Sequence, residues 1–183
     1  VAISGEAVDG HRFIPVAAEK GAACVVCEHV PEGDIPYVQV ASSRKALALM
    51  AGNWFDHPAK EMTMIGVTGT NGKTSVTLLL KQVLEKTLGA KVGLIGTNQN
   101  MIGGEIVPTE RTTPESLELC RHMRNAVDAG LSHMVMEASS QALKYERVGN
   151  THFDTAIFLN ISEDHISPTE HKDFDDYFQS KLK

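Results

Sequence analysis

The stretch Ile65–Ser75, which reads IGVTGTNGKTS, decides how the rest of the chain is interpreted. An apolar segment precedes it and a segment with helical periodicity follows it, which is the context that a phosphate-binding loop needs. The common pattern G-x-x-x-x-G-K-[ST] also requires a glycine where this chain has Val67. The stretch is therefore either a phosphate loop with a different entry or a glycine-rich turn that contains an exposed lysine.

The residue types in the loop favour a phosphate site. Gly69 and Gly72 let the backbone turn and bring its N–H groups close to phosphate oxygens. Lys73 can reach the terminal phosphates, and the hydroxyl of Thr74 is placed to ligate Mg²⁺. The start of the following helix adds a favourable positive end. These residues predict binding of ATP with Mg²⁺.

Strand-like and helix-like segments alternate around this loop, and each strand-like segment is almost continuously apolar. Strands are expected within residues 61–69, 91–97, 131–139 and 153–161, helices within 73–89 and 115–130, and a small hairpin around 103–104. Thr113 is expected to cap the second helix, with Pro114 at its first position. This alternation predicts an α/β fold with a mostly parallel, doubly wound sheet covered on both faces, in which ligands bind at the carboxyl ends of the strands.

The first part of the chain reads as a smaller α/β unit. Two short β-rich runs lie between two helical segments, and the second helix is expected to start at Ser42 or Ser43 and to stop before Pro58. We therefore predict a domain over residues 1–59 and a second domain over residues 60–183. Because the first residues read as the middle of a strand and the last ones as an uncapped helix, we expect both domains to be incomplete.

Composition and charge exclude several classes of protein. The net charge of −6 argues against a nucleic-acid-binding surface, which needs a basic face. No apolar run has the length that a membrane-spanning helix requires. The three cysteines and the lack of a signal-like start favour a reducing cytoplasm, and the Cys24–Cys27 pair is interpreted as core packing rather than a redox or zinc site.

Polar residues follow two of the expected strands. Glu137 ends the strand near residue 135, and a cluster that includes His165 follows the last apolar strand. In a parallel sheet these residues reach the same edge as the phosphate loop, where an acid suits a hard cation bound to ATP. The residues by themselves thus predict an enzyme that uses ATP and Mg²⁺, and they leave its second substrate open.

Four motifs together resemble the Mur ligases: GTNGKTS, RTTPES, MEASSQALKYERV and FLNISEDH, in this order. In that family the phosphate loop lacks the earlier glycine, so Val67 is expected. The resemblance extends to the first domain, which is similar to the family's uridine-nucleotide-binding domain. It implies that the second domain is the family's central ATP-binding domain and that a third, C-terminal domain is absent from this chain.

Within the family, the TTPES and SSQAL segments favour the branch that makes the UDP-N-acetylmuramoyl-tripeptide. The resemblance then implies that ATP activates a carboxylate of UDP-MurNAc-L-Ala-D-Glu as an acyl phosphate, which the amine of L-lysine or meso-diaminopimelate attacks. It also implies a cytoplasmic monomer, with this chain alone inactive. The alternatives are a D-Ala-D-Ala-adding ligase, a folylpolyglutamate synthetase, a P-loop NTPase that is not a ligase, or a module that only binds nucleotide.

The resemblance assigns roles by position. The ATP phosphates are assigned to Gly69, Thr70, Asn71, Gly72, Lys73, Thr74 and Ser75, and the muramoyl-dipeptide nucleotide to Glu6, Ala7, Val8, Thr112, Thr113, Ser139, Tyr145 and Arg147. Metal ligation is assigned to Thr74, Glu137, His165 and Lys181, and catalysis to Lys73, His165 and Lys181.

Lys181 needs a chemical modification for its assigned role. Residues 177–183, YFQSKLK, resemble the family's Y-x-x-A-K segment, with Ser180 in place of alanine. In the family this lysine carries a carbamate formed from CO₂, which inverts its charge and offers oxygen ligands to Mg²⁺. Without the modification, Lys181 is a solvated lysine at a helix end.

Overall fold

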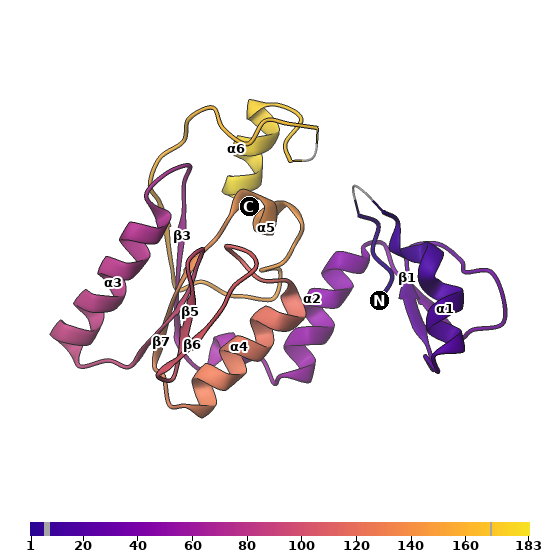
Figure 1. Cartoon of the computed structure of the whole chain (residues 1–183), viewed down its shortest axis with the longest axis horizontal. Coiled ribbons are helices and arrows are strands. Elements are labelled where there is room, and N and C mark those ends of the chain that lie inside the picture. Colours follow the sequence, from indigo (N-terminus) through magenta and orange to yellow (C-terminus); the bar gives the residue numbers. More distant parts are fainter. Residues whose placement is uncertain (6–7, 169) are drawn as a thin grey trace.

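The computed structural model describes residues 1–5, 8–168 and 170–183 (Figure 1). Its helices are η1 (Gly10–Phe13), α1 (Ile14–Glu19), α2 (Ser43–Trp54), η2 (Pro58–Lys60), α3 (Lys73–Leu88), α4 (Ser116–Asp128), α5 (Ser140–Lys144) and α6 (Phe174–Leu182). Its strands are β1 (Val25–Cys27), β2 (Tyr37–Gln39), β3 (Thr63–Thr68), β4 (Val92–Ile95), β5 (Asn100–Ile102), β6 (Glu105–Val107), β7 (His133–Glu137) and β8 (Thr155–Phe158).

The central sheet has the strand order β6-β5-β4-β7-β3-β8. Strands β4, β7, β3 and β8 are parallel, and the β5–β6 hairpin adds to β4 in antiparallel orientation. The prediction of a mostly parallel α/β sheet and of a hairpin around Gly103 is confirmed. Because β3 lies between β7 and β8, the loop after β3 emerges in the middle of the parallel strands, where a ligand can be reached from both sides.

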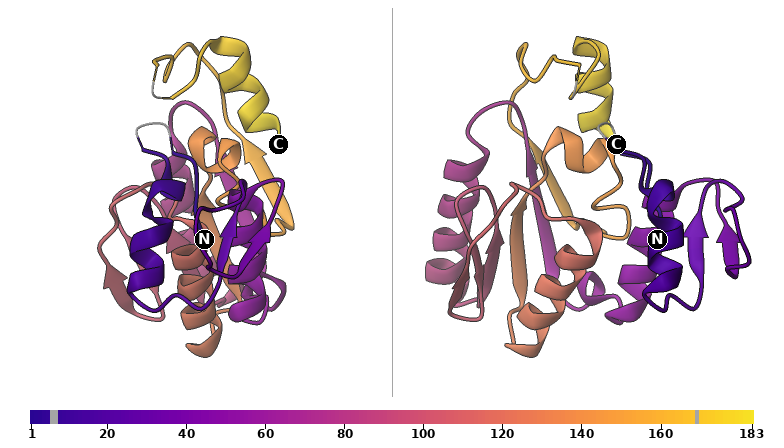
Figure 2. Two further views of the ribbon diagram at one scale, coloured as in Figure 1. Left: turned by 90° about the vertical axis from the view of Figure 1, so that its right-hand side faces the viewer. Right: turned by 45° about the vertical axis from the view of Figure 1, so that its right-hand side comes forward.

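Side chains of β3 alternate between two hydrophobic cores. Met64 packs on the face covered by α4, whereas Ile65 and Val67 pack on the face covered by α3. Figures 1 and 2 show these two helices on opposite sides of the sheet. Met64, Met134 and Met136 are fully buried, and each such side chain contributes about 1.5–3 kcal/mol through its removal from water.

The small N-terminal unit contains one parallel strand pair, β1–β2, and a core of its own around Ile14, Val25 and Cys27. Cys27 is buried there as expected, but Cys24 is exposed. Helix α2 starts with the predicted cap, because the Ser42 hydroxyl accepts a hydrogen bond from the backbone N–H of Lys45. This helix packs against α4 in the second unit, and the division into domains at residues 59 and 60 stays a prediction.

Two local predictions are wrong. Helix α4 begins at Ser116 with Glu115 at its N-cap position, so Thr113 does not cap it. The hydroxyl of Thr113 instead donates to the backbone carbonyl of Glu137, because that tertiary contact outcompetes the local cap. Strand β8 is an edge strand with exposed residues, and the expected coverage on both faces does not extend to it.

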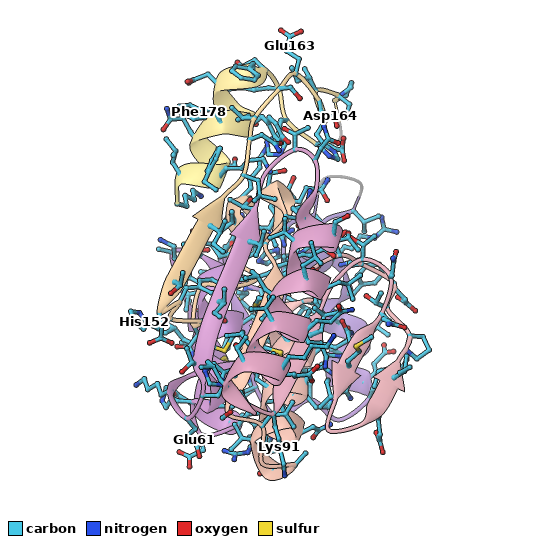
Figure 3. The ribbon with its side chains drawn as sticks, turned by 90° about the vertical axis from the view of Figure 1, so that its left-hand side faces the viewer. Glu61, Lys91, His152, Glu163, Asp164 and Phe178 are labelled. Atoms are coloured by element: carbon cyan, nitrogen blue, oxygen red, sulfur yellow. The ribbon has the colours of Figure 1, made fainter. Side chains whose placement is uncertain are left out.

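The segment that ends in α6 lies over the carboxyl edge of the parallel strands (Figures 1 and 2). Figure 3 shows Glu163 and Asp164 at this end of the molecule and Glu61 and Lys91 at the opposite end. The polar residues that follow β8 are thus at the same edge as the phosphate loop. Among the described helices, none is long and apolar enough to cross a membrane.

Candidate active site

The loop between β3 and α3 adopts a conformation that depends on its glycines. Gly69 has a φ of 151° and Gly72 a φ of 86°, both in the region that residues with a Cβ rarely adopt. The side-chain oxygen of Asn160 accepts a hydrogen bond from the backbone N–H of Asn71 at 3.0 Å, and its side-chain amide donates to the Asn71 carbonyl at 3.1 Å. Asn160 therefore holds the turn of the loop from the neighbouring strand β8.

Glu137 lies at the end of β7 and is buried, with hydrogen bonds to both neighbouring loops. Its two carboxylate oxygens accept from the Thr74 hydroxyl at 3.0 and 3.1 Å. They also accept from the backbone N–H of Thr97 at 2.9 Å and from its hydroxyl at 3.0 Å. A Cβ at position 96 would lie 2.4 Å from one of these oxygens, so Gly96 is needed there. The predicted proximity of Glu137 and Thr74 is confirmed.

Two lysines converge on one backbone carbonyl of the phosphate loop. The ammonium groups of Lys73 and Lys181 donate to the Gly69 oxygen at 2.9 and 3.0 Å. Burial lowers the pKa of Lys73, although the charge of Glu137 acts in the opposite direction. Burial also lowers the pKa of Lys181 to about 8, and the charge of Lys73 adds to this shift. Two cations held so close together favour an anionic ligand between them.

A cavity of about 490 Å³ opens beside these lysines. Its walls come from the start of α3, from the segments after β4, β6, β7 and β8, and from α6. They consist of Lys73, Thr97, Thr109, Glu110, Arg111, Thr112, Ser139, Ser140, Gln141, Arg147, His165, Glu170 and Lys181. The cavity thus gathers residues assigned to ATP, to the second substrate and to metal from segments far apart in the sequence.

Two of the residues assigned to the second substrate are held in place by neighbours rather than left free. The hydroxyl oxygens of Thr112 and Thr97 lie 3.0 Å apart, within hydrogen-bond distance. The guanidinium of Arg147 donates to the Thr113 carbonyl at 3.3 Å, and its Nε atom lies 2.9 Å from Glu115 without hydrogen-bond alignment. Arg147 therefore presents a positive charge to the cavity from a fixed position.

Other assigned residues do not reach the cavity. Thr113 is fully buried and joins two backbone segments, because its hydroxyl also accepts from the Ser139 N–H at 3.1 Å. The ring of Tyr145 lies under the guanidinium of Arg44, 4.4 Å away, and is not among the residues that line the cavity. Val8 is exposed in the N-terminal unit, whereas Glu6 and Ala7 lie outside the described residues.

His165 lines the cavity in a constrained backbone conformation, with a φ of 56°. Its Nδ1 atom lies 3.2 Å from a carboxylate oxygen of Glu170, and its backbone N–H donates to Asp164 at 2.8 Å. The ring also faces Tyr177, with the two centroids 5.8 Å apart. Glu170 fixes the orientation of the imidazole, and the sequence contained no local pattern that marked Glu170 for this contact.

Sequence reasoning also missed Tyr177, which joins α6 to the loop after β3 alongside the predicted Lys181. The buried Tyr177 hydroxyl lies 3.0 Å from the hydroxyl of Thr70, and the Lys181 ammonium lies 4.7 Å from the centre of the Tyr177 ring. The similarity of residues 177–183 to the Y-x-x-A-K segment was the one signal that could have singled out this tyrosine.

Residues 67–183 match the family described as Mur ligase middle domain. The chain belongs to this family. The resemblance read from the four motifs is thus confirmed, and the cavity described above lies in the Mur ligase middle domain.

Curated relatives support the same family. The chain is 45% identical over its full length to the UDP-N-acetylmuramoyl-L-alanyl-D-glutamate–2,6-diaminopimelate ligase of Clostridium botulinum. It is 39% identical over 99% of its length to the ligase of the same name from Listeria monocytogenes. The chain spans 38% and 36% of the length of these two relatives.

Solved structures share the Mur ligase fold. A UDP-N-acetylmuramoyl-L-alanyl-D-glutamate–2,6-diaminopimelate ligase superposes with a TM-score of 0.78 at 23% identity, covering 98% of this chain and 36% of that one. MurF of Thermotoga maritima, in complex with ADP, superposes with a TM-score of 0.56 at 22% identity, covering 99% and 38%. At these identities the likeness shows the fold.

The residues around the phosphate loop fit a hard divalent cation in part. The Thr74 hydroxyl and the Glu137 carboxylate are adjacent oxygen donors of the kind that Mg²⁺ prefers. In the part of the chain that the structure describes, no three His, Cys, Asp or Glu residues form a metal cluster. Lys181 as an ammonium repels a cation, so its assigned role requires the carbamate.

Proposed function

We propose that this Mur ligase domain belongs to an ATP-dependent ligase that adds a diamino acid to UDP-MurNAc-L-Ala-D-Glu. The observation that carries the proposal is the position of the Lys73 ammonium on the loop after β3, next to a cavity that Arg147 also lines. A polyphosphate and a carboxylate must be brought together in this reaction, and each carries negative charge. The cations of this site offset that repulsion.

The chemistry explains why both anions are needed. An amine does not displace oxide from a carboxylate at neutral pH, so the carboxylate is first phosphorylated by ATP. The amine then attacks the acyl phosphate, and phosphate leaves as the amide forms. Holding both reactants in one cavity makes each of these two steps effectively unimolecular, which lowers the entropic part of the barrier.

Roles of individual residues follow from their positions. The loop from Gly69 to Ser75 holds the ATP phosphates, and Lys73 turns from the Gly69 carbonyl to a phosphate oxygen. Thr112, Ser139 and Arg147 hold the dipeptide part of the second substrate. Thr113 and Tyr145, assigned to the same substrate, are not among the residues that line the cavity, and their roles in binding stay predictions.

Thr74 and Glu137 would hold one Mg²⁺, and His165 with carbamylated Lys181 a second. Bound Mg²⁺ neutralises phosphate charge during transfer. The lowered pKa of Lys181, about 8, supports carbamate formation because the neutral amine is the form that reacts with CO₂. Mass spectrometry of the intact chain in bicarbonate, compared with a Lys181→Met variant, tests for the modification.

The second substrate distinguishes this proposal from its alternatives. Curated relatives at 39–45% identity are named for 2,6-diaminopimelate, which favours that diamino acid over L-lysine. The same names speak against a D-Ala-D-Ala-adding enzyme. Glu137 occupies the strand end where a P-loop NTPase switch needs an aspartate. We propose a cytoplasmic monomer that acts on the soluble nucleotide.

The experiment is a phosphate-release assay on the complete enzyme that contains this chain. Phosphate release is expected only when ATP, UDP-MurNAc-L-Ala-D-Glu and a diamino acid are all present, and faster with meso-diaminopimelate than with L-lysine. The chain of 183 residues alone is expected to bind nucleotide without forming product. ATP hydrolysis that ignores the UDP-sugar would refute the ligase and favour an NTPase.

A further inference from the structure

His171 is buried next to the candidate active site, and it is not among the residues that line the cavity. Its side chain is fully buried and packs edge-on against Tyr177, with the ring centroids 5.1 Å apart. On one side, its Nε2 atom lies 2.9 Å from the hydroxyl oxygen of Ser140. On the other side, its Nδ1 atom lies 3.4 Å from a carboxylate oxygen of Asp176, without the alignment of a hydrogen bond.

The surroundings determine which ring nitrogen carries the proton. Asp176 accepts hydrogen bonds from the Lys144 ammonium at 2.8 Å and from the Lys172 N–H at 3.2 Å. The bond from Lys144 is the main cause that lowers the pKa of Asp176, so the group facing Nδ1 is a carboxylate. A lone pair on Nδ1 would be repelled by this carboxylate, whereas an Nδ1–H is attracted.

Complete burial of the ring disfavours its charged form. Burial lowers the pKa of His171, and the positive charge of Lys144 adds to the effect, while Asp176 and Glu170 act in the opposite direction. A neutral ring has one N–H, and Asp176 places it on Nδ1. The Nε2 atom is then an acceptor, and the hydroxyl of Ser140 must donate to it.

This hydrogen bond decides what Ser140 offers to the cavity. A serine hydroxyl has one proton and two lone pairs, and His171 takes the proton. Ser140 lines the cavity, and a lone pair of its hydroxyl stays available to accept a hydrogen bond. The wall also carries the basic side chains of Lys73, Arg111, Arg147 and Lys181, which donate hydrogen bonds, and the carboxylates of Glu110 and Glu170, which accept them. Ser140 therefore adds an uncharged acceptor to a wall whose other acceptors include two carboxylates.

We propose that His171 is a positioning residue that holds Ser140 as a hydrogen-bond acceptor for an N–H donor of the bound substrate. The donor class that fits is an amide N–H of a peptidyl substrate, and this identification of the substrate rests on the proposed function. The position of the proton on His171 does not rest on it, because only residues of this chain determine it.

The decisive measurement is the tautomer of His171 in the intact chain. With ¹⁵N-labelled histidine, long-range ¹H–¹⁵N correlation spectra distinguish a ring protonated on Nδ1 from one protonated on Nε2. A His171→Asn variant identifies the signal among the eight histidines. The proposal expects protonation on Nδ1 near neutral pH. Protonation on Nε2, or on both nitrogens, would overturn it, because Ser140 would then accept the bond and turn its own proton outward.

A matched pair of substitutions tests the consequence for binding. His171→Gln can place an amide oxygen near the position of Nε2 and keep an acceptor for Ser140, whereas His171→Leu cannot. The dissociation constant for UDP-MurNAc-L-Ala-D-Glu is expected to rise about tenfold in His171→Leu and to stay within about threefold in His171→Gln. Circular dichroism and urea midpoints show whether both variants are folded.

The affinity for ATP, measured with the same variants, separates positioning from general damage. A role for Ser140 predicts a larger loss for the dipeptide nucleotide than for ATP, and recovery with glutamine. Equal losses for both ligands, or no difference between leucine and glutamine, would contradict the proposal. If the unsubstituted chain binds ATP but not the dipeptide nucleotide, the proposed substrate is refuted, and the tautomer measurement still decides the role of His171.

Discussion

At the scale of single residues, Glu137 combines a structural and a proposed functional role. Its buried carboxylate accepts from Thr74, in the first turn of α3, and from Thr97, in the segment after β4. A carboxylate in this position can exchange one of these hydrogen bonds for a cation without a large movement. Gly96 leaves the space for the Glu137 side chain, so this carboxylate can take its position only because residue 96 has no Cβ.

Replacement of Glu137 by glutamine tests the cation role. Glutamine keeps the size of the side chain and one oxygen acceptor, but it removes the negative charge. We expect the affinity for ATP in the presence of Mg²⁺ to fall at least about tenfold, with a smaller change in its absence. Isothermal titration calorimetry with and without Mg²⁺ measures both values. An equal loss under the two conditions would show that Glu137 acts only through the fold.

Lys181 makes a prediction about pH. Its pKa is lowered from 10.5 to about 8 in the folded chain. Between these pH values the unfolded chain binds more protons than the folded chain, so the free energy of unfolding rises with pH in this range. Urea unfolding in CO₂-free buffer should show this rise, and Lys181→Met should remove part of it. Lys183→Met, at an exposed neighbouring lysine, should leave the rise unchanged.

At the scale of elements, α6 is a short helix that connects two parts of the site. Its Tyr177 reaches the phosphate loop, and its Asp176 accepts from Lys144 at the end of α5. The helix starts at a cap formed by Asp173, whose carboxylate accepts from the Asp176 N–H at 2.7 Å. The cap therefore affects the orientation of residues that the active site uses.

Loss of this cap should weaken the helix. Asp173→Ala is expected to lower the free energy of unfolding by about 1 kcal/mol, and Asp173→Asn, which can still cap, by much less. Chemical denaturation measures both differences. Hydrogen exchange should also become faster in α6 of the alanine variant while α3 stays unchanged. Similar exchange in α6 of the two variants would show that the cap is not what holds the helix.

At the scale of the whole molecule, the phosphate loop, the segment before α6 and α5 form one connected edge of the sheet. The N-terminal unit lies beside it, and α2 joins that unit to α4 (Figure 1). A ligand on the phosphate loop is therefore expected to stabilise the second unit directly. The β1–β2 pair has its own core and shares few of these contacts.

Addition of ATP with Mg²⁺ tests this arrangement. At a concentration 100 times the dissociation constant, binding to the folded state adds about 2.7 kcal/mol to its stability. Hydrogen exchange should slow in the loop after β3 and in α6, and little in β1 and β2. Mg²⁺ without nucleotide is the control. Protection confined to the N-terminal unit would place the nucleotide elsewhere and contradict the proposed site.

Local patterns predicted most of the elements, because apolar periodicity and glycine positions act over a few neighbouring residues. The segments of α3, β3 and β7 were predicted correctly, as was the hairpin at Gly103. The cap assigned to Thr113 was wrong, since the contact that replaces it comes from the end of another strand. The exposure of β8 was also missed, because an apolar segment gives the same sequence pattern in a central strand and in an edge strand.

The motifs of the chain were enough to predict the family, since the residues of each motif are adjacent along the backbone. The tertiary structure decided which side chains meet. Lys181 and Gly69 are 112 positions apart and in contact, whereas Tyr145 turns toward Arg44 and away from the cavity. The partnership of His171 with Ser140 also has no local signal. Contacts between distant segments depend on how the strands and helices pack, and packing is a property of the whole fold.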